Sequence, residues 1–180
     1  MRSRWNWVLA GAAWWGAVFL SGAALAKAAA PAATALPQPR AAMADAIVVY
    51  KARRELVLYA NGRPIHVIRH IQLGRNAVGA KQVQGDARTP EGRYTIDFGK
   101  QDSAYHLALH VSYPSAQDRA LAQARGQNPG GAIYIHGQPN DWPRGRVPGD
   151  WTQGCIALSN AEIEDLWAMV PDGTPIEIWP

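Results

Sequence analysis

The distribution of apolar and polar residues along the chain predicts a domain built mainly from β-strands. Short runs rich in Val, Ile, Leu and aromatic residues recur from Ala46 onward, and each is too brief for a helix. The Asn61-Gly62 dipeptide between two of these runs is typical of a tight hairpin turn, because both positions tolerate positive φ. The runs that we predict to be strands are 46–50, 56–59, 65–68, 94–98, 107–111, 133–136 and 175–179.

Two short helices are expected among these strands. Ser115 and Asp118 have the spacing of a helix start, and Ser159 and Glu162 form a second capping box. The second helix should end before Pro171 and bury the face made by Ile163, Leu166, Trp167 and Val170. The predicted fold class is therefore mainly β with a few short helices packed on the strands.

The first 26 residues have the pattern of an export signal. Two arginines precede a nearly continuous apolar run over 5–24, and Ala24-Leu25-Ala26 supplies small residues of the kind at which signal peptidases cut. An uncleaved anchor is the alternative, because the run approaches the roughly 20 residues that span a bilayer. In both cases we expect the rest of the chain in the periplasm. Residues 27–45, rich in Ala and Pro, are predicted to be a linker, which leaves 46–180 as the folded domain.

The charge of the chain argues against nucleic acid as a partner. The formal net charge is +4, and two of the positive charges belong to the first 26 residues. No cluster of Lys and Arg with interleaved aromatic residues is present. The small positive excess suits an anionic partner without requiring one.

Cys155 is the only cysteine, and its surroundings indicate nucleophilic chemistry. An exported protein with one cysteine cannot form an internal disulfide, so the thiol is free, intermolecular or catalytic. A buried, inert thiol is the alternative. Alternation along 133–136 places Ile133 and Ile135 on one face of a strand and His136 on the other, at the strand end. A histidine within hydrogen-bond reach can take the proton from a thiol that is otherwise mostly protonated at neutral pH.

Gly154 precedes the cysteine directly. A glycine there allows close approach of the backbone, so that N–H groups can stabilise the oxyanion formed during acyl transfer.

The segment around Cys155 resembles the catalytic domain of the L,D-transpeptidases (YkuD type) and is most similar to the YafK-like branch of that family. The resemblance extends to 85–94, 109–114 and 171–175, and so covers nearly all of the predicted domain. The residues that carry it at the cysteine are Asp150, Trp151, Thr152, Gln153, Gly154, Cys155, Ile156, Ala157 and, further on, Asn160.

The resemblance implies a YkuD-like catalytic fold and a peptidoglycan enzyme without metal or cofactor. Cys155 would attack the carbonyl of meso-diaminopimelate in a wall stem peptide and release D-alanine, and an amine would then accept the acyl group in a 3→3 crosslink or a lipoprotein linkage. His136 would be the base, oriented by the carbonyl of Gly137. The amides of Gly154 and Cys155 would form the oxyanion hole. The expected partners are stem peptides, with a wall-linked lipoprotein as an alternative.

The chain departs from the broader family signature at two positions. Gln153 stands where the signature has His before Gly-Cys, and Ala157 replaces a basic or amide residue. Gln cannot carry a proton charge, so any acid–base role at that position is lost. Two alternatives therefore stay open. One is a cysteine amidase or carboxypeptidase that hydrolyses crosslinks or lipoprotein linkages, and the other is a degenerate wall-binding module.

Four residues near the expected site are candidates for substrate binding: Arg88, Trp151, Thr152 and Gln153. An arginine can bind a carboxylate through two parallel hydrogen bonds, and an exposed tryptophan can line a groove. The pairs His66/His70 and His106/His110 have the four-residue spacing of a helical zinc site. They lie in strand-like sequence, where four residues span about 13 Å, so we predict no metal site.

Overall fold

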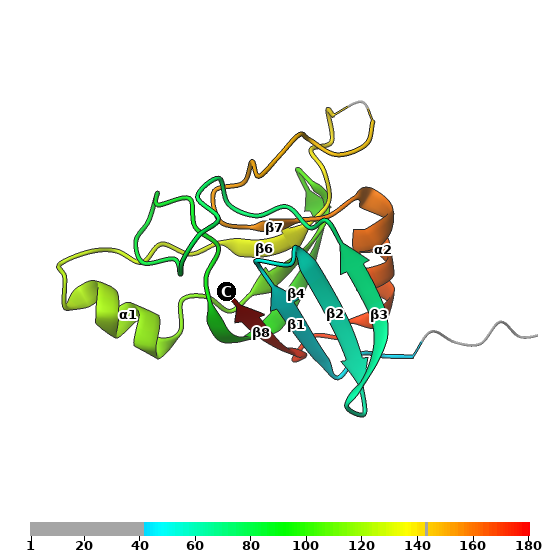
Figure 1. The fold of residues 1–180 in the computed structure, drawn as a ribbon, viewed down its shortest axis with the longest axis horizontal. Coiled ribbons are helices and arrows are strands. Elements are labelled where there is room, and N and C mark those ends of the chain that lie inside the picture. Colours follow the sequence, from blue (N-terminus) through cyan, green and yellow to red (C-terminus); the bar gives the residue numbers. More distant parts are fainter. Residues whose placement is uncertain (1–41, 143) are drawn as a thin grey trace, which may run out of the picture. The chain divides into compact units, whose positions relative to one another are not determined.

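Eight strands form one continuous sheet in the order β3-β2-β1-β8-β4-β5-β6-β7 (Figure 1). The computed structural model describes residues 42–142 and 144–180. Most neighbouring strands are antiparallel, whereas β1 pairs with β8 and β6 pairs with β7 in parallel. The strands are β1 Ala46–Tyr50, β2 Glu55–Ala60, β3 Arg63–Arg69, β4 Gly92–Ser103, β5 His106–Val111, β6 Ile133–His136, β7 Ile156–Ala157 and β8 Pro175–Trp179, and the helices are α1 Ala116–Gln123 and α2 Asn160–Met169.

The seven predicted strands and both predicted helices are present, so the fold class is confirmed. Asn61 and Gly62 have φ values of 53° and 71°, as the predicted hairpin turn between β2 and β3 requires. Two features were not predicted. Strand β4 continues to Ser103 through two irregularities in its pairing with β5, and β7 contains only Ile156 and Ala157.

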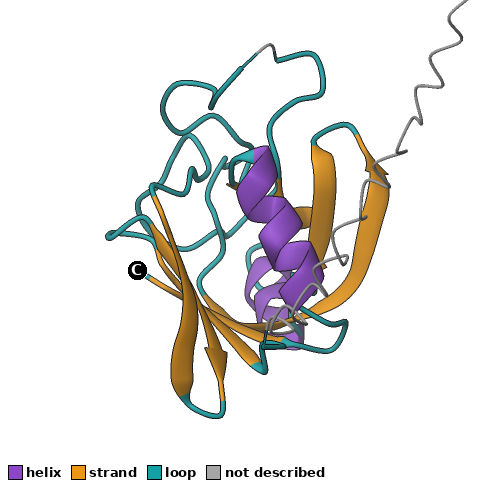
Figure 2. Cartoon of the chain, turned by 90° about the vertical axis from the view of Figure 1, so that its right-hand side faces the viewer, coloured by secondary structure: helices purple, strands orange, loops and turns teal. Residues whose placement is uncertain are grey.

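Helix α2 lies between the two arms of the sheet and covers the core (Figure 2). Ser159 and Glu162 close its capping box, and Ile163 and Leu166 are fully buried. The predicted buried face is correct except that Trp167 is only partly buried. Its ring packs on Gly99, where an added Cβ would lie 2.5 Å from the indole.

The folded domain includes two residues of the predicted linker. The amide of Ala44 donates to Met169 O at 2.8 Å, and that of Asp45 donates to Tyr59 O at 2.9 Å. The predicted export signal and the linker up to residue 41 lie outside the described residues. Within 42–142 and 144–180, no helix has the length and apolar character needed to cross a membrane.

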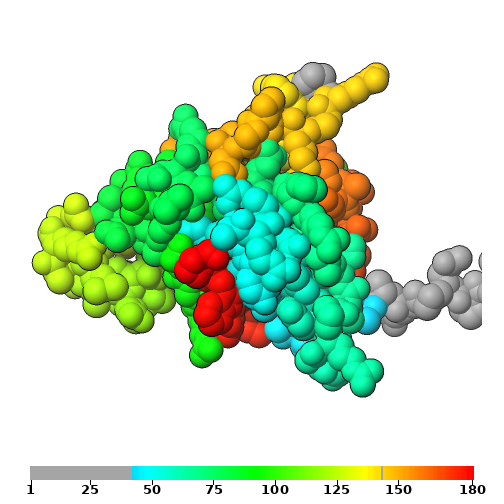
Figure 3. Space-filling model, in the orientation of Figure 1, coloured from blue at the N-terminus to red at the C-terminus, as the bar shows by residue number. Residues whose placement is uncertain are grey.

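Residues 74–91 form a long loop beside α1 (Figure 3). Gln84 N donates to Asn128 O at 2.8 Å, and Arg125 binds the side chain of Gln82. The loop therefore braces the segment that leads into β6.

Candidate active site

Cys155 and His136 line the same pocket, of about 280 Å³. The thiol is partly exposed there, so the alternative of a sulfur sealed in the core does not apply. The pocket lies on the face of β4–β5–β6 opposite α2. Its described lining residues are Lys100, Ser103, Ala104, Tyr105, Ala108, Ala132, Tyr134, His136 and Cys155.

The pairing of β6 brings the two candidate residues together. Ile133 and Ile135 point into the core and are 2% and 0% exposed, so alternation turns Tyr134 and His136 toward the pocket. Strand β7 runs parallel to β6, with Ile156 beside Ile135. Continuing that register back by one residue sets Cys155 beside Tyr134, on the same face as His136.

The His136 imidazole is held in one tautomer. Its Nδ1 lies 2.7 Å from the carbonyl oxygen of Gly137, which can only accept, so Nδ1 carries the proton and Nε2 is left as the acceptor. The ring of Tyr105 packs against it at 4.5 Å, and that of Trp151 at 5.6 Å. Burial lowers the pKa of His136, and the Gly137 hydrogen bond only partly opposes this, so the ring is neutral at neutral pH.

Gly137 has to be glycine because other groups surround its Cα closely. An added Cβ would lie 2.7 Å from Asn160 Oδ1 and 3.0 Å from Tyr105 O. The Gly137 N–H donates to Tyr105 O at 3.0 Å and to Leu107 O at 3.2 Å. Asn160 also accepts from Gln138 N at 2.9 Å. Asn160 was part of the recognised motif but was not among the predicted site residues, and it fixes the carbonyl that orients His136.

The Thr152 side chain organises the loop that presents Cys155. Its buried hydroxyl donates to Cys155 O at 2.8 Å and accepts from Gly154 N at 3.1 Å. Gly154 has φ +129°, and an added Cβ would lie 2.6 Å from Arg88 O. The Gly154 amide is thus engaged by Thr152, whereas the Cys155 amide has no acceptor within 42–142 and 144–180. The Cys155 amide is therefore the freer donor for an oxyanion.

The Cys155 thiol is protonated at neutral pH in the unliganded site. Burial raises its pKa, and the Tyr134 backbone amide and the charge of Lys81 oppose the shift without cancelling it. Its Sγ lies 3.6 Å from Ala132 O. The pocket therefore holds a neutral thiol and a neutral imidazole rather than a thiolate and an imidazolium.

The four predicted substrate-binding residues surround the site but are not among the described residues that line its pocket. Trp151 packs against His136 and donates to Gln72 Oε1 at 3.3 Å. Thr152 makes the loop contacts above, and Gln153 is exposed. Arg88 has a buried Nε with no partner within the described residues. Their roles as substrate contacts stay predictions.

Several pocket residues were not predicted from the sequence, because they belong to strands that are distant from His136 along the chain. Lys100, Ser103 and Tyr105 lie at the β4–β5 hairpin, and only the long-range pairing of β5 with β6 brings them to His136. Tyr134 could have been found, since alternation places it on the same face as His136.

Two of the other histidines, His106 and His110, each pair with a single carboxylate. His106 Nε2 lies 2.6 Å from Glu164, and His110 Nδ1 lies 2.6 Å from Asp97. His110 also stacks on Phe98 at 4.6 Å. Within the described parts of the chain, no group of three or more His, Cys, Asp or Glu side chains is arranged to hold a metal ion.

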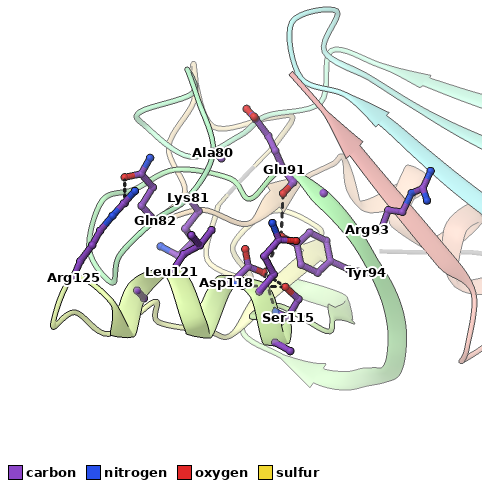
Figure 4. A pocket seen from close by; sticks show the side chains of 14 residues that line it. Ala80, Lys81, Gln82, Glu91, Arg93, Tyr94, Ser115, Asp118, Leu121 and Arg125 are labelled. Carbon is purple, nitrogen blue, oxygen red and sulfur yellow. Dashed lines mark hydrogen bonds between the residues drawn. The ribbon is translucent and has the colours of Figure 1, made fainter.

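A larger pocket of about 620 Å³ lies between α1 and the start of β4 (Figure 4). It contains neither Cys155 nor His136. Several of its polar side chains bond to one another: Tyr94 OH lies 3.2 Å from Asp118 and 3.1 Å from Glu91 O, and Arg125 binds Gln82. Of these two pockets, only the smaller is lined by a cysteine and a histidine.

Comparison with known proteins places this geometry in a family. The family model of the L,D-transpeptidase catalytic domain, YkuD, matches residues 44–178. YafK of Escherichia coli (strain K12), which its name places among the L,D-transpeptidases, is 29% identical over 129 residues, covering 69% of this chain and 46% of YafK. The chain therefore spans about half the length of the curated relatives it matches.

Solved structures share the fold. The helical cell shape determining protein Pgp2 from Campylobacter jejuni is 26% identical with a TM-score of 0.60, over 77% of this chain and 50% of Pgp2. An L,D-transpeptidase from Mycobacterium smegmatis is 16% identical with a TM-score of 0.50, over 76% of this chain and 59% of that one, and shows the fold alone. The predicted YkuD-like fold is confirmed. Because the family model matches more than half of its length, the chain belongs to the L,D-transpeptidase (YkuD) catalytic domain family.

Proposed function

We propose that this protein is a peptidoglycan L,D-transpeptidase that acts on meso-diaminopimelate stem peptides through a Cys155 acyl-enzyme. The observation that supports it most is the shared pocket of Cys155 and His136, in which Nε2 is the ring nitrogen without the proton. Membership of the family supports a peptidoglycan stem peptide as the substrate. The export pattern of residues 1–26 supports a periplasmic site of action.

The first half-reaction starts from a neutral pair. As Sγ attacks the L-centre carbonyl of diaminopimelate, His136 Nε2 takes the thiol proton, and the carbonyl becomes an oxyanion beside the Cys155 amide. When the tetrahedral intermediate collapses, the C–N bond to D-alanine breaks and the imidazolium returns the proton to the leaving amine. The product is a thioester on Cys155 with the base neutral again.

The second half-reaction repeats these steps with an acceptor. His136 takes a proton from an incoming amine as its nitrogen attacks the thioester, and the thiolate that leaves recovers a proton. An amine acceptor gives a crosslink, whereas water gives a trimmed stem. Gln153 is exposed and cannot carry a proton charge, so the acid–base chemistry of both halves falls to His136.

The role in the cell follows from the same chemistry. Pgp2 is described as a helical cell shape determining protein, and the similarity supports a function in remodelling the wall and so in cell shape. Both crosslinking and trimming of stems would change the mechanics of the wall.

Defined muropeptides test the proposal directly. The full chain and its Cys155→Ala variant are incubated with tetrapeptide stems, and the masses of the protein and of the products are measured by mass spectrometry. We expect an adduct on Cys155 in the wild type only, with release of D-alanine. Crosslinked dimers identify transfer, and free tripeptide stems identify hydrolysis. An unmodified Cys155 with no released D-alanine would favour the wall-binding module instead.

A further inference from the structure

Lys100 is the only permanently charged side chain among the described residues that line the Cys155 pocket. The other lining side chains are alanines, neutral hydroxyl-bearing residues, the thiol and His136, whose charged form burial disfavours. An ammonium group in an otherwise neutral pocket marks the place where a negative charge on a ligand would be most favoured.

The strand register places Lys100 in line with the base. Lys100 on β4 pairs with Ala108 on β5, and Ala108 pairs with His136 on β6. The three side chains therefore share one face, and two strand spacings separate Lys100 from His136 by about 10 Å. Ala108 has a small side chain, so the floor between the ammonium and the imidazole is open.

The Lys100 ammonium is available to a ligand. It donates to Asp102 Oδ1 at 2.8 Å, but the two side chains are 42% and 87% exposed, and an exposed ion pair of this kind is worth little. An ammonium carries three donors, so it can bind a second carboxylate while keeping Asp102 or exchange one for the other. Asp102 raises the pKa of Lys100, so the charge is kept across the physiological range.

We propose that Lys100 binds a substrate carboxylate next to the acyl group that Cys155 attacks, and so selects anionic acyl donors. The identity of that carboxylate rests on the proposed function, which this inference deepens. Next to that acyl group a diaminopimelate stem offers two carboxylates: the terminal carboxylate of the departing D-alanine, and the carboxylate at the D-centre of the diaminopimelate side chain.

The charge selectivity is measured first with two thiol reagents of similar size. Iodoacetate is anionic and iodoacetamide is neutral, so the ratio of their alkylation rates at Cys155 reports the local potential. We expect Lys100→Gln to lower this ratio about threefold at low salt, which is the effect in water of one unit charge about 6 Å from the carboxylate of the reagent. The difference should shrink as salt is added. Asp102→Asn should raise the ratio.

Two controls accompany these variants. Arg63→Gln removes the same charge at an exposed position on the far edge of the sheet and should leave the ratio unchanged. A far-ultraviolet circular dichroism spectrum equal to that of the wild type shows that each variant is folded. A ratio in Lys100→Gln equal to that of the wild type would overturn the proposal.

Amidated stems then identify the carboxylate. With stems that carry both free carboxylates, Lys100→Gln should raise KM several-fold and change kcat little. Amidation of the contacted carboxylate should abolish the difference between wild type and variant, and amidation of the other should preserve it. A difference that survives both amidations would overturn the proposal. Absence of turnover with every stem would count against the proposed function, while the reagent ratio would still decide the role of Lys100.

Discussion

The Nδ1–H of His136 donates a hydrogen bond to the carbonyl oxygen of Gly137 at 2.7 Å, and this bond leaves Nε2 as the ring nitrogen that can accept a proton. The bond is local in sequence, but its direction depends on distant contacts. Gly137 is clamped by the Tyr105 and Leu107 carbonyls, and Asn160 packs against its Cα. The tautomer of the base is therefore set by the β5–β6 pairing and the start of α2.

Replacement of His136 should slow the alkylation of the Cys155 thiol without unfolding the domain. In His136→Ala we expect alkylation of Cys155 by iodoacetamide near pH 7 to fall at least tenfold, because the raised pKa of Cys155 leaves little thiolate and no acceptor is left for its proton. Stopped alkylation followed by mass spectrometry measures the rate. His106→Ala removes a more exposed histidine bonded to Glu164 and should react like the wild type. Equal rates in His136→Ala and the wild type would refute the assignment of the base.

The pH dependence should have one acid limb and a long plateau. Burial lowers the pKa of His136, so the neutral base forms as pH rises through a value below its usual 6.5. The pKa of Cys155 is raised above 9.0, so the thiol form persists through neutral pH. We therefore expect kcat/KM to increase with increasing pH in the range below pH 6.5, and then to stay level up to about pH 9.

The same titration can be followed without a substrate. Ultraviolet absorbance of the thiolate, with Cys155→Ala as the blank, should show no thiolate at pH 7 in the wild type. A thiolate signal of full amplitude at that pH would mean that an ion pair already exists and would contradict the neutral starting state.

Much of this candidate site could be predicted from the sequence, because Cys155 and His136 lie in segments whose local pattern indicates their structure. Alternation along 133–136 gave the facing of His136, and the Gly154-Cys155 pair marked the loop. Lys100 and Tyr105 could not be found in that way, since their approach to His136 depends on which strands pair and in which register. Strand β7 was not predicted for another reason: a strand of two residues is too short to show the alternation of apolar and polar positions.

Ionised Asp86 should stabilise the loop 74–91 at pH values above about 4. Burial acts to raise its pKa, but hydrogen bonds from Gln82 N, Lys81 Nζ, Val83 N and Arg88 N outweigh it and lower the pKa to about 2. Because the folded value lies below the usual 3.8, this stabilisation is present above pH 4 and is lost as pH falls from about 4 to about 2.

Urea unfolding of Asp86→Asn tests this linkage. At about pH 5 the variant should be less stable than the wild type by about 1–2 kcal/mol, after allowance for solvent screening, and at about pH 2 the two should converge. Asp141→Asn, which removes one carboxylate at an exposed loop position, is the matched control. A constant gap at both pH values would argue against an ionised Asp86 as the cause.

Gly154→Ala should disrupt the nucleophile loop by a specific clash. Its φ of +129° already disfavours a side chain, and a Cβ would lie 2.6 Å from Arg88 O, so the loop has to move. We expect a loss of about 1–3 kcal/mol in the free energy of unfolding and a loss of nearly all turnover. Gly149→Ala, with φ +69° and open space around the new Cβ, carries backbone strain without the clash. It should cost stability while keeping thiol reactivity, and an inactive Gly149→Ala would show that strain alone explains the effect.

Thr152→Val separates the hydroxyl of Thr152 from its shape. Valine fills the same buried space but cannot donate to Cys155 O or accept from Gly154 N, so two hydrogen bonds are lost and the buried Gly154 N–H loses its acceptor. The expected cost is about 1–3 kcal/mol in stability, measured by chemical denaturation, with a fall in kcat because the Cys155 amide is no longer held in place. Thr152→Ser keeps the hydroxyl and should restore most of the activity. If Thr152→Ser were as impaired as Thr152→Val, packing of the methyl group rather than the two hydrogen bonds would hold the loop.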